Sequence, residues 1–120
     1  MSLFDEQSAF SADVARLITW VLAQGYKVSF GEAWRTAEQQ AIYVKTGRSK
    51  TLKSKHLERL AVDLNFKSKT GKMLCSVEDH AEIGRYWESL SIKNRWGGNF
   101  DKDWSKSDNF KDAPHFERVV

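Results

Sequence analysis

The pattern of apolar and polar residues first indicates a long helix at the start of the chain. Apolar side chains recur at intervals of three and four residues, a spacing that gathers them on one face of a helix. Gly25 provides a C-terminal stop, so the pattern predicts a helix over residues 5–24 with one buried face. The residues on that face are Phe10, Val14, Leu17, Ile18, Val21 and Leu22.

Two further helices are predicted from the residues that begin them. Thr36 and Gln39 have the spacing of a capping box, and the helix that they open should end near Gly47. Ser76 and Asp79 repeat this pattern before a third helix. The apolar face of the third helix carries Ile83, Trp87 and Leu90.

Strict alternation of apolar and polar residues predicts a strand over residues 61–66. Val62, Leu64 and Phe66 would face one way, while the opposite face presents Asp63. Further strands are expected over 26–35 and 115–119, with a strand and turn at 96–98. The segments 48–55, 67–72 and 101–111 are predicted loops and turns. These elements indicate one α+β domain over residues 1–120, with a small, mostly antiparallel sheet and helices packed on one side.

Composition narrows the class of protein. A chain of 120 residues with 29% charged residues favours a single soluble domain, and no apolar run is long enough to span a bilayer. The first residues, MSLFDEQSAF, lack the features of a secretory signal, so we expect synthesis in a cytoplasm. With a single cysteine, Cys75, the chain cannot build a thiolate-rich zinc site. The net charge of +3 suits an anionic polymer but is weak support for nucleic-acid binding.

Two histidines and two aspartates are the candidate catalytic and metal-binding residues. His56, Asp63 and His115 would give one Zn²⁺ two imidazoles and a carboxylate, and would leave the fourth tetrahedral position free for water. Asp112 is then a spare carboxylate close to the metal, as a general base must be. On a strand over 115–119, His115 and Glu117 share one face. Two adjacent strands with aligned polar faces would bring Asp63 and His115 to one metal ion.

The same residues carry a family resemblance. Residues 54–63 read SKHLERLAVD and resemble the SxHxxGxAxD motif of the zinc D-alanyl-D-alanine peptidases. Residues 112–117, DAPHFE, resemble the second motif of that group, and the aspartate three positions before its histidine is typical of the L-alanyl-D-glutamate peptidase branch, which includes phage endolysins. Residues 31–40 and 96–100 resemble two further blocks. The resemblance covers about residues 30–120 and implies a fold related to lysostaphin and the hedgehog signalling domain.

The resemblance also implies roles for individual residues. His56, Asp63 and His115 would bind zinc, Asp112 would be the base, and Arg35 would polarise the scissile carbonyl. Ser54 is expected to support the site by hydrogen bonding, Glu117 to orient a ligand or form a salt bridge, and Trp34 and Trp96 to wall the cleft. Each has a structural alternative: a lysine partner for Asp63, a turn for Asp112, a surface ion pair for Arg35 and a core position for the tryptophans.

Three other expectations concern single side chains. The motif's glycine is replaced by Arg59, which we expect to adopt an ordinary backbone angle. His80 is expected to be solvated on its helix, and Cys75 to be a small buried side chain.

The function that these patterns favour is a zinc peptidase that hydrolyses an amide of the peptidoglycan stem peptide. The resemblance implies the L-alanyl-D-glutamate bond and a phage endolysin that reaches the wall after release from the host cytoplasm. We expect a monomer with no nucleic-acid partner and no membrane insertion. The alternatives are a D-alanyl-D-alanine carboxypeptidase that uses the basic residues near the site, a non-catalytic wall-binding or virion protein that keeps zinc, and a metal-dependent nuclease.

Overall fold

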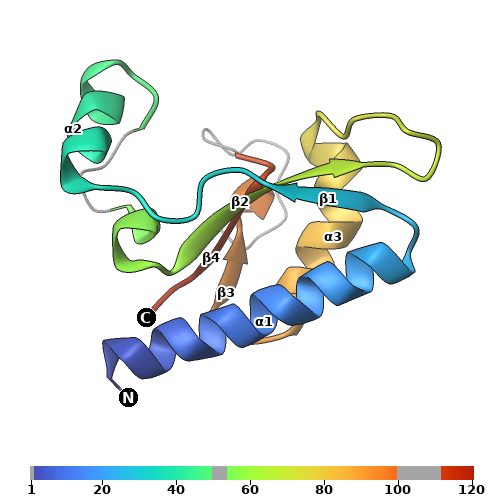
Figure 1. The fold of residues 1–120 in the computed structure, drawn as a ribbon, viewed down its shortest axis with the longest axis horizontal. Coiled ribbons are helices and arrows are strands. Elements are labelled where there is room, and N and C mark those ends of the chain that lie inside the picture. The colour runs from blue at the N-terminus through green and yellow to red at the C-terminus, as the bar shows by residue number, and fades with distance from the viewer. Residues whose placement is uncertain (1, 50–53, 100–111) are drawn as a thin grey trace.

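The computed structural model describes residues 2–49, 54–99 and 112–120. Figure 1 shows a long first helix lying along a twisted sheet, with a short helix, α2, standing apart at one end of the molecule. None of the helices in the described ranges combines the length and hydropathy that a bilayer-spanning segment needs. The helices are α1 (Leu3–Ala23), α2 (Ala37–Lys45) and α3 (Val77–Ser89), with short 3-10 turns η1 (Lys55–Glu58) and η2 (Gly97–Asn99); the strands are β1 (Lys27–Phe30), β2 (Ala61–Lys67), β3 (Asn94–Trp96) and β4 (His115–Arg118).

The helices begin where their capping residues predict. Thr36 accepts a hydrogen bond from the backbone N–H of Gln39 at the start of α2. Ser76 and Asp79 form a complete capping box at the start of α3, in which each side chain accepts from the other residue's N–H. Ser2 and Asp5 form an equivalent box at the start of α1, which therefore begins two residues earlier than the apolar pattern indicated.

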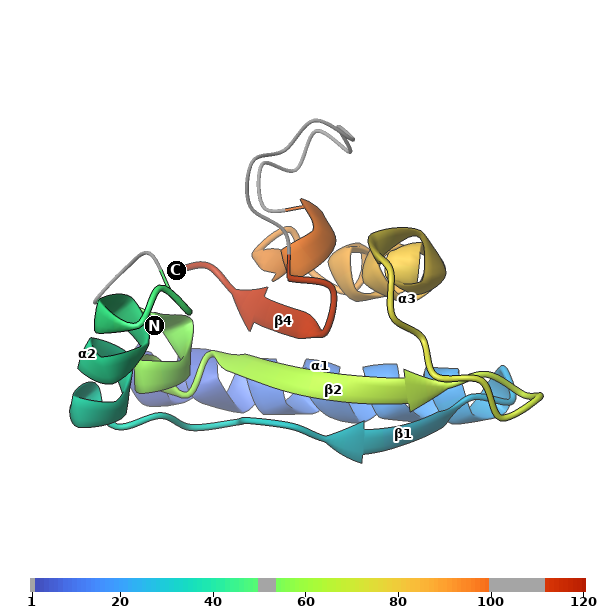
Figure 2. The same cartoon turned by 90° about the horizontal axis from the view of Figure 1, so that it is seen from above.

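The four strands pair antiparallel in the order β1-β2-β4-β3. β2 and β4 are therefore neighbours although they are far apart in the sequence, and Figure 2 shows them side by side. Asp63 lies directly opposite His115 in this pairing, and Val62 lies opposite Phe116. The predicted α+β fold with a mostly antiparallel sheet is confirmed.

The apolar face of β2 covers the core. Leu64 and Phe66 are buried together with Phe116 of β4, in one cluster with residues of α1 and α3. α1 and α3 contact each other and supply the other half of this cluster, whose members from these helices are Phe10, Val14, Leu17, Val21, Ile83 and Trp87. Because side chains alternate across a strand, Asp63 points to the opposite face, away from the core.

The strand expected over 26–35 is shorter than predicted. It ends at Phe30, because Gly31 and Glu32 both oppose the single residue Asp63. The N–H of Gly31 donates to the carbonyl of Asp63 at 2.8 Å, and the N–H of Asp63 donates to the carbonyl of Glu32, also at 2.8 Å. Two residues opposite one is the arrangement of a β-bulge, which bends a strand out of the regular ladder. The chain leaves the sheet here and continues toward α2.

Three expectations for single side chains are wrong. Arg59 has φ 57° and ψ 36°, so it occupies the left-handed region that the motif's glycine would favour. His80 is 1% exposed; its Nδ1 lies 2.7 Å from the carbonyl of Ser76, and its ring packs edge-on against Phe66. Cys75 is exposed, just before α3.

Candidate metal centre

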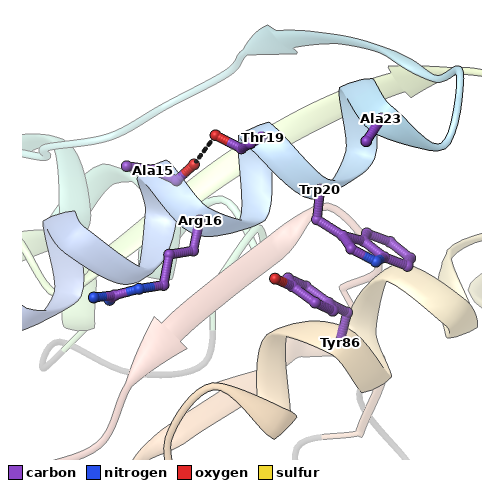
Figure 3. A pocket seen from close by; sticks show the side chains of 6 residues that line it. All are labelled: Ala15, Arg16, Thr19, Trp20, Ala23 and Tyr86. Carbon is purple, nitrogen blue, oxygen red and sulfur yellow. Dashed lines mark hydrogen bonds between the residues drawn. The ribbon is translucent and has the colours of Figure 1, made fainter.

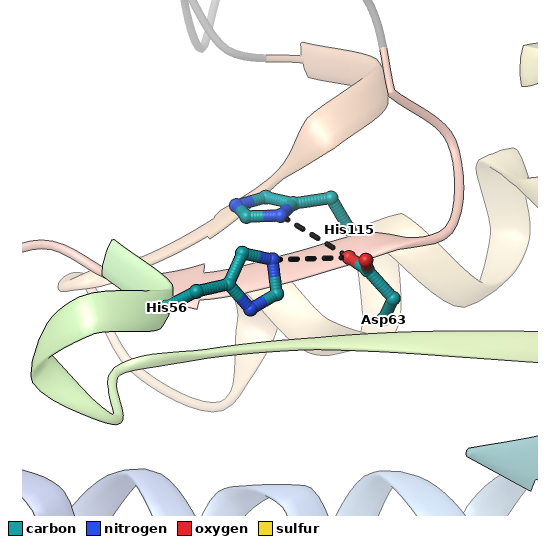
Figure 4. Close-up of side chains that lie close together, drawn as sticks. All are labelled: His56, Asp63 and His115. Atoms are coloured by element: carbon teal, nitrogen blue, oxygen red, sulfur yellow. Dashed lines mark ion pairs between the residues drawn. The ribbon is translucent and has the colours of Figure 1, made fainter. Parts of the chain in front are cut away.

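Three side chains from separate elements converge on the polar face of β2 (Figure 4). Asp63 lies on β2 and His115 on β4, while His56 enters from η1. The Oδ1 atom of Asp63 is 3.3 Å from His56 Nε2 and also 3.3 Å from His115 Nδ1. One ligand atom from each residue lies within 4.8 Å of the other two. The structure thus brings together the three residues that the sequence nominated as metal ligands.

A short turn places His56. The hydroxyl of Ser54 accepts the N–H of His56 at 3.2 Å and so caps η1. At the other end, Arg59 in its left-handed conformation returns the chain to β2, and its N–H donates to the carbonyl of His56 at 3.4 Å. His56 is therefore fully buried within this short 3-10 helix, and its ring is directed at Asp63.

Each histidine is held at its outer nitrogen, away from Asp63. His56 Nδ1 lies 3.0 Å from the carbonyl of Ala33, which can only accept, so Nδ1 carries the proton and Nε2 presents its lone pair inward. His115 Nε2 lies 2.6 Å from Glu117 Oε1, so Nε2–H donates outward and Nδ1 faces Asp63. Partners of this kind fix the tautomer and ring orientation of metal-binding histidines.

Arg95 anchors the carboxylate behind His115. Its Nε and Nη2 both donate to Glu117 Oε2, at 3.0 and 2.7 Å. Glu117 is buried; burial raises its pKa, but the contacts with His115 and Arg95 outweigh that effect and lower it overall. Glu117 is therefore a carboxylate that orients His115, which is the ligand-orienting arrangement considered from the sequence, and it also pairs with Arg95.

The charges of Asp63 and His115 depend strongly on each other. Burial raises the pKa of Asp63, but the adjacent imidazoles of His115 and His56 outweigh it and lower the pKa to about 2. Burial lowers the pKa of His115, but Asp63 and Glu117 outweigh it and raise the pKa to about 9. Without a metal ion, the two adjacent carboxylates therefore stabilise the protonated form of His115.

The donor set fits a zinc ion. Asp63 Oδ1 is buried and accepts no hydrogen bond from any described residue, although two nitrogens lie close to it. A buried carboxylate oxygen of this kind calls for a cation. Zinc bonds of about 2.0–2.1 Å in a tetrahedron separate neighbouring ligand atoms by about 3.3 Å, which matches both observed nitrogen–oxygen distances. Two imidazoles and one carboxylate are also the ligand types that zinc prefers in catalytic sites.

Asp112 lies at the turn before β4, beside the three candidate ligands. Its N–H donates to the carbonyl of Gly97 at 2.8 Å, and its own carbonyl accepts from the N–H of His115 at 3.0 Å. A Cβ atom at Gly97 would lie 1.9 Å from the Asp112 carbonyl oxygen, so this approach requires glycine. Burial raises the pKa of the Asp112 carboxyl; the charge of His115 opposes this rise, and that of Asp63 reinforces it.

Arg35 is held on several sides. Its Nε pairs with the Glu32 carboxylate, one Nη donates to Gln40 Oε1 at 2.6 Å, and the same Nη lies 3.4 Å from Ser54 Oγ. The guanidinium also stacks on the ring of Tyr43, at 4.6 Å from its centroid. Arg35 is therefore fixed next to the residue that caps His56, and its charge acts on Asp112. The surface ion pair considered from the sequence is present in part, but the side chain is only 11% exposed.

Sequence reasoning did not find Gln40. This residue is 1% exposed on α2 and bonds Arg35 through its Oε1, while its Nε2 donates to Ser49 Oγ at 2.9 Å. A glutamine in a short, mostly exposed helix is expected at the surface. The available signal was its place at the end of residues 31–40, the segment that resembles a block of the family.

The two tryptophans differ in their surroundings. Trp96 is 1% exposed, its Nε1 donates to the carbonyl of Ala113 at 2.7 Å, and its ring packs where a Cβ at Gly84 or Gly98 would clash. It is therefore a core residue that supports the turn before His115 instead of walling a cleft. Trp34 is 50% exposed and lines a groove of about 360 Å³ between α1 and the start of β2. The structure does not place it against the three candidate ligands.

Trp34 also contacts Arg59. The Arg59 guanidinium lies over the indole, 4.8 Å from the ring centroid. A left-handed backbone strains a residue other than glycine by about 1 kcal/mol or more. An exposed cation–π contact contributes about 0.5–1 kcal/mol. The two effects are similar in size, so the stacking of Arg59 on Trp34 largely offsets the cost of its backbone conformation.

A second hollow, of about 470 Å³, lies between α1 and α3 (Figure 3). Its main feature is the stacked pair Trp20 and Tyr86, whose ring centroids are 4.4 Å apart and whose planes differ by 9°. Thr19 bonds to the carbonyl of Ala15 within the same helix. The lining residues are Ala15, Arg16, Thr19, Trp20, Ala23 and Tyr86, so none of the three candidate ligands contributes to it.

Comparisons with known proteins place the chain among peptidases of one kind. A family model described as phage L-alanyl-D-glutamate peptidase matches residues 9–119. The L-alanyl-D-glutamate peptidase of Listeria phage A118 is 33% identical over 108 residues, which make up 88% of this chain and 35% of that protein. The chain thus spans about a third of the length of this curated relative. The crystal structure of the L-Ala D-Glu endopeptidase ChiX from Serratia marcescens matches with a TM-score of 0.65 and 27% identity, over 90% of this chain and 79% of that one.

Proposed function

Because the chain belongs to the phage L-alanyl-D-glutamate peptidase family, we propose that it is a zinc-dependent peptidase that hydrolyses the bond between L-alanine and D-glutamate in peptidoglycan stem peptides. The observation that carries this proposal is the convergence of His56, Asp63 and His115 with both imidazoles held from behind. The family match supports the substrate, and the donor set supports the metal. A single catalytic unit over residues 1–120, acting as a monomer, is part of the same proposal.

The three ligand atoms would be His56 Nε2, His115 Nδ1 and Asp63 Oδ1. A zinc ion bound there supplies Lewis-acid polarisation of the scissile carbonyl and lowers the pKa of a water molecule. The protein's part is to present all three atoms without rearrangement. The carbonyl of Ala33 and the carboxylate of Glu117 do this, because each fixes the orientation of one imidazole.

Asp112 is the general base of the proposed reaction. It takes a proton from the attacking water and later delivers that proton to the leaving amine of D-glutamate. A general base works best when its pKa approaches the working pH, and burial shifts the pKa of Asp112 in that direction. Its backbone hydrogen bonds to Gly97 and His115 fix its position relative to one ligand.

Arg35 stabilises the negative charge that develops on the scissile carbonyl oxygen. Electrostatic stabilisation of this kind is effective when the donor is oriented before the reaction begins. Glu32, Gln40 and Ser54 hold two of the guanidinium nitrogens, and the third, Nη2, has no hydrogen-bond partner among the described residues. That nitrogen is the one available to a substrate oxygen.

Digestion of purified sacculi and of a synthetic stem peptide tests the proposal. We expect new D-glutamate amino termini, identified by mass spectrometry, with loss of activity after chelation and recovery on addition of zinc. His56→Ala should be inactive under all of these conditions, and Arg16→Gln, a change on the far side of α1, should retain activity. Release of D-alanine would identify a carboxypeptidase instead, and an active chelated protein would contradict the metal assignment.

Cell-wall action follows from the proposed substrate. The curated phage relative carries the name of an L-alanyl-D-glutamate peptidase, which supports an endolysin that reaches the wall after release from the host cytoplasm. The protein is added from outside to permeabilised cells and to intact cells, and the difference in lysis measures this requirement for access. Plasmid DNA incubated with the protein and zinc should stay intact, which separates the peptidase from a metal-dependent nuclease.

A further inference from the structure

We propose that Arg59, which acts through Trp34, is a positioning residue that holds His56 in the orientation needed for metal binding. The inference rests on the proposed metal site but is independent of which peptide bond is cleaved. It assigns a purpose to an arginine in a backbone conformation that favours glycine. Backbone strain at a single residue persists where surrounding contacts maintain it, and such residues cluster at functional sites.

The first step is the contact between two segments. Arg59 ends η1, the turn that carries His56, and its guanidinium extends over Trp34 at 4.8 Å from the ring centroid. Trp34 belongs to residues 31–36, which form neither helix nor strand. The cation–π contact therefore joins η1 to the part of this segment that lies beyond the backbone hydrogen bonds of Gly31 and Glu32 with Asp63.

The second step is what that irregular segment does. Trp34 lies between Ala33 and Arg35, and both neighbours bond to His56. The carbonyl of Ala33 accepts from His56 Nδ1 at 3.0 Å, and the N–H of Arg35 donates to the carbonyl of His56 at 3.3 Å. The segment thus holds both the ring and the backbone of this ligand. A shift of Trp34 would move both contacts together.

The third step concerns how firmly Trp34 is held without Arg59. Half of its surface is exposed, and Phe10 and Val14 line the same groove with apolar surface. Apolar contacts are non-directional and tolerate sliding of the indole. The guanidinium over the ring face adds a directional contact, because attraction to the ring quadrupole depends on position over the ring. Arg59 therefore fixes Trp34 relative to η1, and the carbonyl of Ala33 relative to His56.

Arg59→Gly tests this inference because it separates stability from metal affinity. Glycine relieves the left-handed backbone but loses the stacking on Trp34, and because these two effects are similar in size the thermal midpoint of the chelated protein should change little. The zinc dissociation constant, measured by competition with a chromophoric chelator, should nevertheless increase about tenfold, the lower end of the range for residues behind metal ligands. Trp34→Ala should weaken zinc binding by a similar factor, and the double variant should be no weaker than the weaker single variant.

Two controls complete the experiment. Arg59→Lys keeps a cation over the indole and should recover most of the zinc affinity, whereas Lys45→Gln removes another exposed cation on α2 and should change nothing. Unchanged zinc affinity in both Arg59→Gly and Trp34→Ala would overturn the inference. An equal loss of zinc affinity in Arg59→Lys and Arg59→Gly would overturn it too. Failure of the wild-type protein to bind zinc would instead refute the proposed metal site itself.

Discussion

Asp63 and His115 lie directly opposite each other on two antiparallel strands, with Asp63 Oδ1 3.3 Å from His115 Nδ1. The pairing of β2 with β4 fixes this distance, because side chains of directly opposed residues emerge on the same face of a sheet. The register that buries Val62 and Phe116 is therefore also the register that creates the candidate metal site. A slip of one residue would expose the apolar face and separate the ligands.

Asp112→Asn should separate catalysis from metal binding. The substitution keeps the size of the side chain but removes its ability to accept a proton, so kcat should fall by a factor of about 10²–10⁴. The zinc dissociation constant should change by less than about threefold, since Asp112 is not among the three grouped ligand residues. Steady-state kinetics on a synthetic stem peptide and zinc competition on the same preparation measure both. Full activity in this variant would refute the role of Asp112.

Glu117→Ala should weaken zinc binding although Glu117 is not one of the proposed ligands. The carboxylate accepts from His115 Nε2–H at 2.6 Å and orients the ring. Loss of such a partner typically reduces metal affinity about 10- to 100-fold. Arg95→Gln leaves Glu117 in place and should cause a smaller loss. Zinc titrations of the two variants compare these effects, and equal affinity for wild type and Glu117→Ala would be inconsistent with an orienting role.

Zinc binding should release a proton from His115. The pKa of this residue is raised to about 9 in the metal-free protein, so at pH 7 it is protonated, whereas coordination through Nδ1 requires the neutral ring. The raised pKa means that the proton is retained below pH 9 and lost above it, so zinc should bind more tightly as pH rises toward 9. Calorimetry in buffers of different ionisation enthalpy should detect about one proton released near pH 7.

Glu6 should contribute to stability in a pH-dependent manner. Hydrogen bonds from Lys93, and then from Arg118, outweigh burial and lower its pKa below the ordinary value of 4.5. A lowered carboxyl pKa stabilises the fold above the unfolded-state value and loses that contribution as pH falls through the folded-state value. Glu6→Gln should therefore be less stable than wild type at neutral pH, and the difference should shrink below pH 4.5. Urea unfolding across this range measures it.

Gly97→Ala should disturb the turn that holds Asp112. The added methyl group would lie 1.9 Å from the Asp112 carbonyl oxygen and 2.8 Å from His115 Cβ, so the backbone must move. Because Asp112 and His115 both belong to this turn, activity and zinc affinity should fall together. Gly71→Ala is a useful contrast: it has open space around its Cβ but a φ of 88°, so it should affect stability alone.

The sequence predicted that Asp63 and His115 lie together because the alternation of apolar and polar residues identifies which residues of a strand share a face. Asp63 and His115 stand out as polar side chains flanked by apolar neighbours, and their positions indicate two adjacent strands. The left-handed backbone of Arg59 was indicated only by the glycine that the motif carries at this position, and the contact of its side chain with Trp34 joins two segments that are separate in the sequence. A local sequence carries no signal for a contact between distant segments.

Burial of single polar residues was also beyond local patterns. Gln40 and His80 are buried because particular partners satisfy them: Arg35 and Ser49 for Gln40, and the carbonyl of Ser76 for His80. Propensity and periodicity place polar residues of a helix on the solvent side by default. The bulge opposite Asp63 likewise depends on the pairing of β1 with β2, so the observed strand is shorter than the one expected over 26–35.

The nonlocal origin of the three ligand atoms has a consequence for how the protein would respond to metal supply. An unfolded chain does not hold residue 115 near residues 56 and 63, so only the native arrangement offers a high-affinity set of donors. Zinc would therefore favour the native state by mass action. A cell or extract poor in zinc would contain less folded protein as well as less active protein, and proteolytic lifetime would vary with the free concentration of the ion.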